Sequence, residues 1–175
     1  MPYAFDGALN MNPESPRGIA LCRRLVLAAG TLIRRSLGES FKLRYKGAIN
    51  LVTSVDLAAE KMVVTGLRKA FPQAGILAEE GGISGGSGNG GRFVLDPLDG
   101  TTNFAHGIPH CAVSLAYENK EGGSFGMIYN PFLDEFFHGR RGQGAFLGRQ
   151  RIRVSKTQAL SRALLSTGFS YRKGE

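Results

Sequence analysis

The stretch VLDPLDGTTNF, residues 94–104, carries the side chains best suited to chemistry. Asp96 and Asp99 stand three residues apart around Pro97. Two carboxylates this close repel each other, so a fold tolerates them where a cation or backbone amides lie between them. Because these hard oxygen donors have no histidine or cysteine among them, they favour Mg²⁺ over zinc. The stretch predicts a metal site, with Pro97 stiffening the turn that lets both aspartates face one ion.

Other acids and hydroxyl groups fit the same chemistry. Glu79 and Glu80 end an apolar run, and Asp56 lies near a predicted helix start. Gly100 and Thr101 stand where another helix is expected to begin, which leaves backbone amides suited to phosphate. A metal ion beside such amides polarises a phosphate and lowers the pKa of a bound water, and a threonine is placed to orient that water. These features predict phosphoryl chemistry.

Each of these residues also has a plainer interpretation. Asp56 taken alone is more often a helix N-cap, and the glutamate pair Glu79–Glu80 before glycines is also typical of a solvated turn. The histidines have no spacing typical of metal ligands, and we interpret them as surface or core residues; they are His106, His110 and His138.

The glycine-rich segment from Gly81 to Gly91 allows two interpretations. Its GSGNGG portion formally matches a dinucleotide-binding fingerprint, but it leads into a predicted strand instead of a helix, and we reject the match. A mobile flap beside the acids and an inert linker both remain open.

Composition limits the partners. With 175 residues and 42% hydrophobic content, the chain can form one domain or part of a larger protein. Its net charge of +8 suits a nucleic acid, an anionic substrate or the basic half of a larger protein. The basic residues lack the aromatic interleaving of single-strand binding surfaces, so nucleic acid is not an expected partner.

Cysteine usage and hydropathy predict the compartment. Cys22 and Cys111 show neither metal-ligand spacing nor a disulfide framework, which favours the reducing cytoplasm. The sequence shows no export signal and no run of about eighteen apolar residues, so we expect a cytoplasmic protein that does not enter the membrane.

The elements that must position the acids follow from periodicity and turn residues. Ser15 and Pro16 are typical of a helix start, and the helical spacing of apolar residues predicts a helix up to Gly38. A second helix is predicted within residues 50–71, ending before Pro72.

Short β-branched and aromatic runs between turn residues predict strands. The predicted strands are 75–80, 92–96, 111–117, 124–130, 134–139, 144–148 and 151–154, and 163–170 is expected to begin another. Helices followed by consecutive hairpins favour an α+β fold, with helices packed on a mostly antiparallel sheet. We expect an amino-terminal tail over residues 1–14 and a metal-binding domain over 15–175.

Three segments, LVTSVD, ILAEEGG and FVLDPLDGTTNF, resemble in this order the inositol monophosphatase family of Mg²⁺-dependent, lithium-sensitive phosphatases. The resemblance spans residues 15–169 and implies the first half of a layered αβαβα sugar-phosphatase fold. It assigns Glu79, Asp96 and the Leu98 carbonyl to one metal ion. Asp96 and Asp99 would share a second ion, and Glu80 would lie just behind.

The resemblance also implies a mechanism and a substrate. Asp56 and Thr101 resemble the pair that activates the attacking water. The Gly100 and Thr101 amides would hold the phosphate, and Lys46 matches a basic residue near the metal. Inositol monophosphate is the first substrate implied. Fructose bisphosphate, nucleotide bisphosphates and histidinol phosphate are alternatives, as is a non-catalytic half-protein that binds RNA or a protein through its basic surface.

One departure from the family is large. Its members continue into a second α/β half whose tryptophan-aspartate motif completes the second metal site, and this chain has no tryptophan. We therefore expect a chain truncated at its carboxyl end or a natural half-protein, and a homodimer when the protein is full length.

Overall fold

The computed structural model describes residues 10–39, 43–46, 50–86 and 91–166, with the backbone alone for 43–46, 50 and 51. The helices are α1 (Pro16–Ser36), α2 (Ser54–Ala70), α3 (Thr101–Ala105) and the 3-10 turn Leu160–Arg162. The strands are β1 (Leu43–Lys46), β2 (Asn50–Thr53), β3 (Gly75–Ala78), β4 (Gly82–Ser84), β5 (Arg92–Asp99), β6 (Ala112–Asn119), β7 (Gly122–Asn130), β8 (Glu135–Arg140), β9 (Gly144–Leu147) and β10 (Gln150–Ile152).

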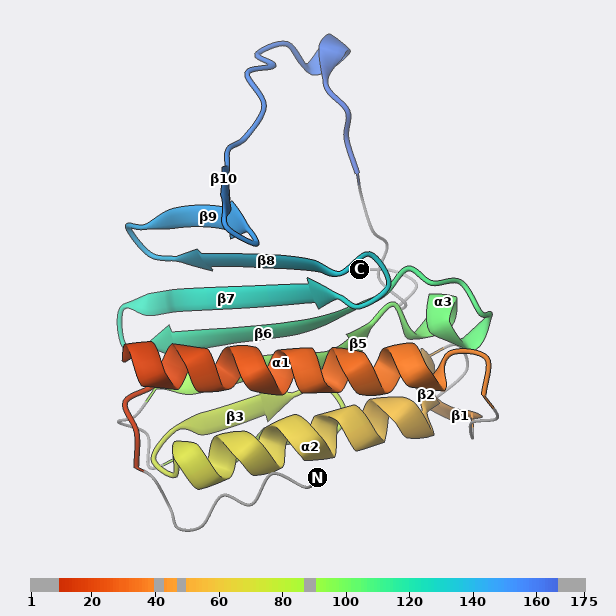
Figure 1. Ribbon diagram of the computed structural model, residues 1–175, viewed down its shortest axis with the longest axis vertical. Coiled ribbons are helices and arrows are strands. Elements are labelled where there is room, and N and C mark those ends of the chain that lie inside the picture. Colours follow the sequence, from red (N-terminus) through yellow and green to blue (C-terminus); the bar gives the residue numbers. More distant parts are fainter. Residues whose placement is uncertain (1–9, 40–42, 47–49, 87–90, 167–175) are drawn as a thin grey trace.

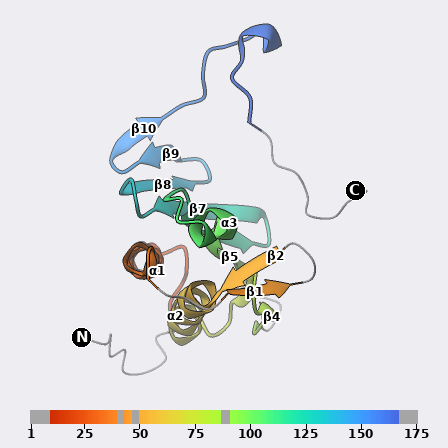
Figure 2. The same ribbon diagram turned by 90° about the vertical axis from the view of Figure 1, so that its right-hand side faces the viewer.

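The two long helices cover one face of an eight-stranded sheet (Figure 1). The strand order is β10-β9-β8-β7-β6-β5-β3-β4, and β1 pairs with β2 in a separate two-stranded sheet. Figure 2 shows this small sheet at the same end of the molecule as α3, and β2 contacts both α2 and α3. The predicted α+β class, with helices packed on a mostly antiparallel sheet, is confirmed.

Capping residues, prolines and a glycine mark the ends of the two long helices. Ser15 caps α1, its Oγ accepting a hydrogen bond from the Gly18 amide at 3.0 Å, and Pro16 occupies the first helical position. The predicted start of α1 is correct, and the helix ends just before Gly38. α2 ends before Pro72, as predicted. Their buried apolar faces pack on the sheet and on each other.

The sheet is an antiparallel meander from β5 to β10, as predicted, but it contains one parallel pair. β3 runs parallel to β5, with Ala78 opposite Leu95. Parallel neighbours bring their carboxyl ends to the same edge of a sheet. The acids that follow β3 and those at the end of β5 therefore meet.

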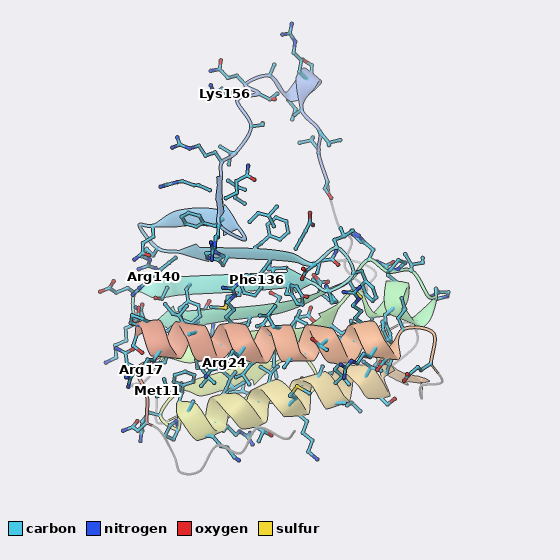
Figure 3. All side chains as sticks on the ribbon, viewed as in Figure 1. Met11, Arg17, Arg24, Phe136, Arg140 and Lys156 are labelled. Carbon is cyan, nitrogen blue, oxygen red and sulfur yellow. The ribbon has the colours of Figure 1, made fainter. Side chains whose placement is uncertain are left out.

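Three strands were not predicted, and one predicted strand is wrong over the part that the structure describes. β1, β2 and β4 are absent from the prediction, although β4 continues directly from the glutamate turn. Of the strand predicted over 163–170, residues 163–166 are not in a strand, and 167–170 lie outside the described residues. The segment after β10 extends away from the long helices, with Lys156 on it (Figure 3). Within the described ranges, no helix is long and apolar enough to cross a membrane.

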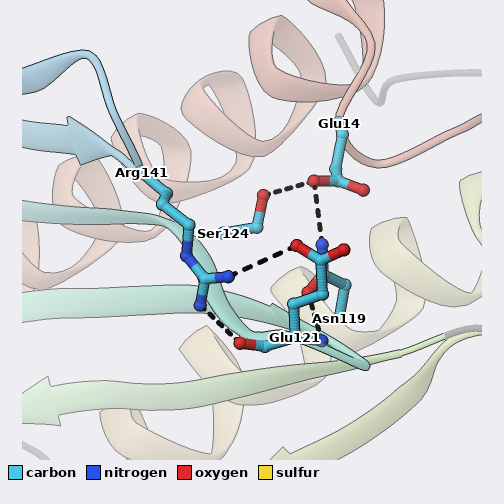
Figure 4. A network of polar contacts seen from close by, with 5 residues as sticks. All are labelled: Glu14, Asn119, Glu121, Ser124 and Arg141. Carbon is cyan, nitrogen blue, oxygen red and sulfur yellow. Dashed lines mark hydrogen bonds and ion pairs between the residues drawn. The ribbon is translucent and has the colours of Figure 1, made fainter.

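A polar network holds the start of α1 to the turn between β6 and β7 (Figure 4). Glu14 Oε1 accepts hydrogen bonds from the Ser124 hydroxyl and from Asn119 Nδ2, the latter at 3.3 Å. Arg141, on the turn between β8 and β9, donates to the Glu121 carbonyl at 2.7 Å. The network lies beside the start of β5, at the end of the strand opposite its aspartates.

Gly30 lies where α1 closely approaches Tyr129 of the sheet, and this approach predicts a stability effect. A Cβ at Gly30 would lie 2.6 Å from Tyr129 Cε1, and the Tyr129 hydroxyl is held by Asp134 at 2.9 Å. We expect Gly30→Ala to lower the free energy of unfolding by about 1–2 kcal/mol, because overpacking outweighs the helix-propensity gain of about 1 kcal/mol. Urea unfolding would measure it. Gly126→Ala is the control, since nothing lies within 4 Å of its added Cβ, and an equal loss there would contradict the prediction.

Candidate metal centre

The carboxylates of Glu79 and Asp96 come together at the shared edge of β3 and β5. The Glu79 amide donates to the Leu95 carbonyl at 3.1 Å, which extends the parallel pairing by one residue. Glu79 lies close enough to Asp96 for a side-chain hydrogen bond between them. One ion is therefore able to reach both carboxylates.

A β-bulge sets the direction of the two aspartates in β5. Side chains at positions i and i+3 of a regular strand point to opposite faces of the sheet. Between Asp96 and Asp99, however, two residues of β5 oppose a single residue of β6. The extra residue reverses the alternation, so both aspartates approach the same side. This resolves how a pair of acids three apart can act together.

The surroundings of Asp96 shift the pKa of its carboxyl group. Burial, then the charge and hydrogen bond of Glu79 and the charge of Asp99, together raise the pKa of Asp96 to about 8. The Leu98 amide, which donates to Asp96 Oδ1 at 3.1 Å, acts in the opposite sense. A cation bound here would favour the charged form of Asp96 and lower its pKa again.

Asp56 bridges helix α2 to the loop after β5. Thr53 is the N-cap of α2, and Asp56 returns the capping box: its Oδ2 accepts from the Thr53 amide at 2.9 Å and from the Thr53 hydroxyl. Its other oxygen, Oδ1, accepts a hydrogen bond from the Thr101 hydroxyl at 2.8 Å. Asp56 is only 2% exposed, and these bonds satisfy a carboxylate that would otherwise be costly to bury. Asp56 thus supports the helix start and reaches the candidate site.

The Thr101 hydroxyl also lies 3.0 Å from the Leu98 carbonyl. A hydroxyl has one proton, so it cannot donate to Asp56 and to Leu98 at the same time. The charged carboxylate is the stronger and nearer acceptor. The Leu98 carbonyl therefore keeps acceptor capacity at the site, which suits a metal ligand.

Gly100 lets the chain turn between β5 and α3. Its φ is +96°, and a Cβ would lie 2.9 Å from the His110 carbonyl and 3.1 Å from Cys111 Cβ. Only glycine accepts both the left-handed conformation and this close approach. The turn places Thr101 at the first position of α3. Phosphate binding by the amides of Gly100 and Thr101 stays a prediction.

Glu80 and Lys46 are the expected residues at the margin of the site, and their roles stay predictions. The Glu80 amide donates to the Glu60 carboxylate at 2.9 Å, and sequence analysis missed Glu60 although it lies one helical turn after Asp56. Lys46 ends β1, and its side chain lies outside the described part of the structure.

The glycine-rich segment lies beside the acids only at its start. Gly81 and Gly82 follow the glutamates, whereas a Cβ at Gly86 would lie 2.7 Å from the Gly75 backbone, at the opposite end of β3. Residues 87–90 lie outside the described residues. The flap interpretation is therefore wrong for Gly85 and Gly86, which pack beside the strand start.

The donor set fits Mg²⁺ in kind: carboxylates and one carbonyl, all hard oxygens. Across the described ranges, no three histidine, cysteine, aspartate or glutamate side chains are arranged to hold an ion as they stand. Glu79 and Asp96 are in contact, while Asp99 is exposed at the end of β5. Ligation by all three acids requires side-chain movement and stays a prediction.

Comparison with known proteins identifies the family. A model of the inositol monophosphatase family matches residues 18–175. This chain belongs to that family. It is 45% identical over 156 residues to "Nus factor SuhB" from Pseudomonas aeruginosa, covering 87% of this chain and 58% of the relative. It is 41% identical over 145 residues to "Inositol-1-monophosphatase" from Rhizobium meliloti, covering 82% of this chain and 54% of the relative.

A solved structure shows the same fold. Extragenic suppressor protein SuhB from Bartonella henselae superposes with a TM-score of 0.77 at 41% identity, over 79% of this chain and 55% of that one. This chain spans about half the length of the relatives it matches.

The crowded carboxylates predict two opposite effects of Asp96→Asn. Without metal, we expect the melting temperature to rise by roughly 2–4 °C, about 1 kcal/mol, because folding near neutral pH no longer requires Asp96 to take up a proton beside Glu79. With millimolar Mg²⁺, the wild-type protein should gain stability, and the variant should not. Thermal unfolding with and without Mg²⁺ measures both. Glu118→Gln, in the exposed ion pair with Arg92, is the control expected to change neither, and a full Mg²⁺ response in Asp96→Asn would contradict the assignment.

Proposed function

We propose that the protein hydrolyses a phosphate monoester with the help of Mg²⁺, and that inositol monophosphate is its first candidate substrate. The observation that carries the proposal is the hydrogen bond of 2.8 Å from the Thr101 hydroxyl to buried Asp56, beside the contacting acids Glu79 and Asp96. A structural helix cap needs Thr53 and Asp56 but has no need of Thr101. Membership in the inositol monophosphatase family supports phosphatase chemistry.

Each residue has a defined part in this proposal. Glu79, Asp96 and the Leu98 carbonyl would hold one Mg²⁺, and Asp96 and Asp99 would share a second. Bound Mg²⁺ supplies charge that polarises a phosphate and acidifies a coordinated water. The amides of Gly100 and Thr101, with Lys46, would bind the anionic phosphate.

The Asp56–Thr101 pair is suited to handle a proton. Because the Thr101 hydroxyl donates its proton to Asp56 Oδ1, its lone pairs point away from Asp56 and are able to accept a proton from water. Asp56 keeps this orientation because its other oxygen is fixed by Thr53. The pair thus orients an attacking water and draws its proton toward Asp56 Oδ1.

The proposed substrate rests on the name of one relative and on the net charge of this chain. The Rhizobium meliloti relative is named inositol-1-monophosphatase, and the net charge of +8 suits an anionic substrate. Fructose bisphosphate, nucleotide bisphosphates and histidinol phosphate remain alternatives, because the matched relatives extend well beyond the aligned part. A homodimer of the longer protein stays a prediction.

A second candidate function is binding to a macromolecular partner. Several relatives are named Nus factor SuhB, and the basic charge of this chain suits an acidic partner. Such binding has no chemical need of Thr101. Substitution at Thr101 therefore separates the two functions, since binding would survive a change that removes hydrolysis.

The water-orienting role predicts the kinetics of Thr101 variants. The assay uses this chain and a chimera extended with the matching remainder of the Pseudomonas aeruginosa relative. In whichever protein is active, Thr101→Ala should lower kcat for inositol monophosphate about 100-fold or more, whereas Thr101→Ser should keep most turnover because it keeps the hydroxyl. Phosphate release measures this effect.

Thr102→Ala is the matched control, because Thr102 is an exposed neighbour in α3. It should leave kcat unchanged. Hydrolysis that persists after chelation of divalent cations, or full turnover in Thr101→Ala, would defeat the proposed mechanism.

A further inference from the structure

Helix α2 presents a second buried carboxylate to the candidate metal centre, one turn beyond Asp56. Glu60 is 8% exposed, and its Oε2 accepts a hydrogen bond from the Glu80 amide at 2.9 Å. Residues four apart lie on the same face of a helix. Asp56 and Glu60 therefore point from one helix face to two different turns: Asp56 to the turn after β5, and Glu60 to the turn after β3.

The turn after β3 is built closely around Glu60. A Cβ on Gly81 would lie 2.8 Å from Glu60 Oε1, so the chain passes the carboxylate at a distance that only glycine permits without displacement. One oxygen of Glu60 thus binds the Glu80 amide, and the other lies against Gly81. The carboxylate is fixed to the turn that follows Glu79.

From these contacts we infer that Glu60 is a positioning residue that holds the Glu79 carboxylate against Asp96 and so sets the affinity of the metal centre. This inference rests on the proposed metal-dependent function. Glu79 directly follows β3, and without a tether on the following turn its carboxylate would be free to move away from Asp96. The Glu60 bond to the next residue's amide opposes that movement. Groups that orient metal ligands typically contribute 10-fold to 100-fold to metal affinity.

The tether is tested first by the environment of the Glu80 amide. In Glu60→Ala the amide loses its acceptor, and we expect its hydrogen exchange to accelerate at least tenfold in metal-free protein. In Glu60→Gln the side-chain carbonyl still accepts, and exchange should remain close to wild type. Lys61→Ala, at an exposed neighbouring position in α2, is the control and should change nothing.

The functional consequence is tested by direct cation binding, which needs no turnover. Calorimetric titration with Mg²⁺ or Mn²⁺ should show affinity lowered about 10-fold or more in Glu60→Ala and largely restored in Glu60→Gln. Gly81→Ala provides a second route if Glu60→Ala fails to fold, because it disturbs the carboxylate from the other side without removing it. It too should weaken cation binding.

The outcomes separate this inference from the proposed function. If Asp96→Asn removes cation binding while Glu60→Ala and Gly81→Ala leave it at the wild-type level, the positioning role is wrong and the metal centre stands. If the wild-type protein shows no cation binding that Asp96→Asn removes, the metal centre itself is wrong, and the role of Glu60 falls with it.

Discussion

The close approach of the Glu79 and Asp96 carboxylates, which repel each other when both are charged, is the constraint on which the rest of the site depends. Burial and like charge raise the pKa of Asp96 to about 8, so the fold holds these groups together against their electrostatic preference. Two backbone features bring this about: the parallel pairing of β3 with β5, and the bulge within β5. A bound divalent cation would stabilise the two neighbouring carboxylates, so the arrangement that is unfavourable without metal is suited to bind one.

Helix α2 serves as the common support for both acidic turns. Its cap residue Thr53 fixes Asp56, and Asp56 accepts from Thr101 at the start of α3. One turn later, Glu60 accepts from the Glu80 amide. Because the apolar face of the same helix is buried against the sheet, the positions of these polar groups depend on core packing. Changes in the core beneath α2 are therefore expected to alter chemistry as well as stability.

Sequence reasoning succeeded where the signals were local. The Ser15–Pro16 start of α1, the end of α2 before Pro72 and the antiparallel meander all follow from capping, proline and turn residues. The family motifs also identified Asp56 and Thr101, which the structure brings into contact. For Asp56, the N-cap interpretation is wrong, because Thr53 is the N-cap and Asp56 lies at the third helical position, where its carboxylate completes the capping box.

The features that sequence reasoning missed arise from pairing between distant segments. No local pattern shows that Pro97 and Leu98 oppose one residue of β6, so the bulge was invisible. Glu60 was detectable in principle from its four-residue spacing after Asp56, but its partner is twenty residues away.

The length of β3 separates the acids of the site from the segment that connects β4 to β5. The segment between β4 and β5 returns beside Gly75, where the Gly75 amide donates to the Gly91 carbonyl at 2.9 Å. The four residues of β3 lie between this point and Glu79, a length of about 13 Å. We therefore expect changes in the length of that connection to be absorbed at the far end of the strands, while the register beside Ala78 and Leu95 stays fixed. Evolution, or a protein engineer inserting a reporter there, is free to vary this loop without moving the acids.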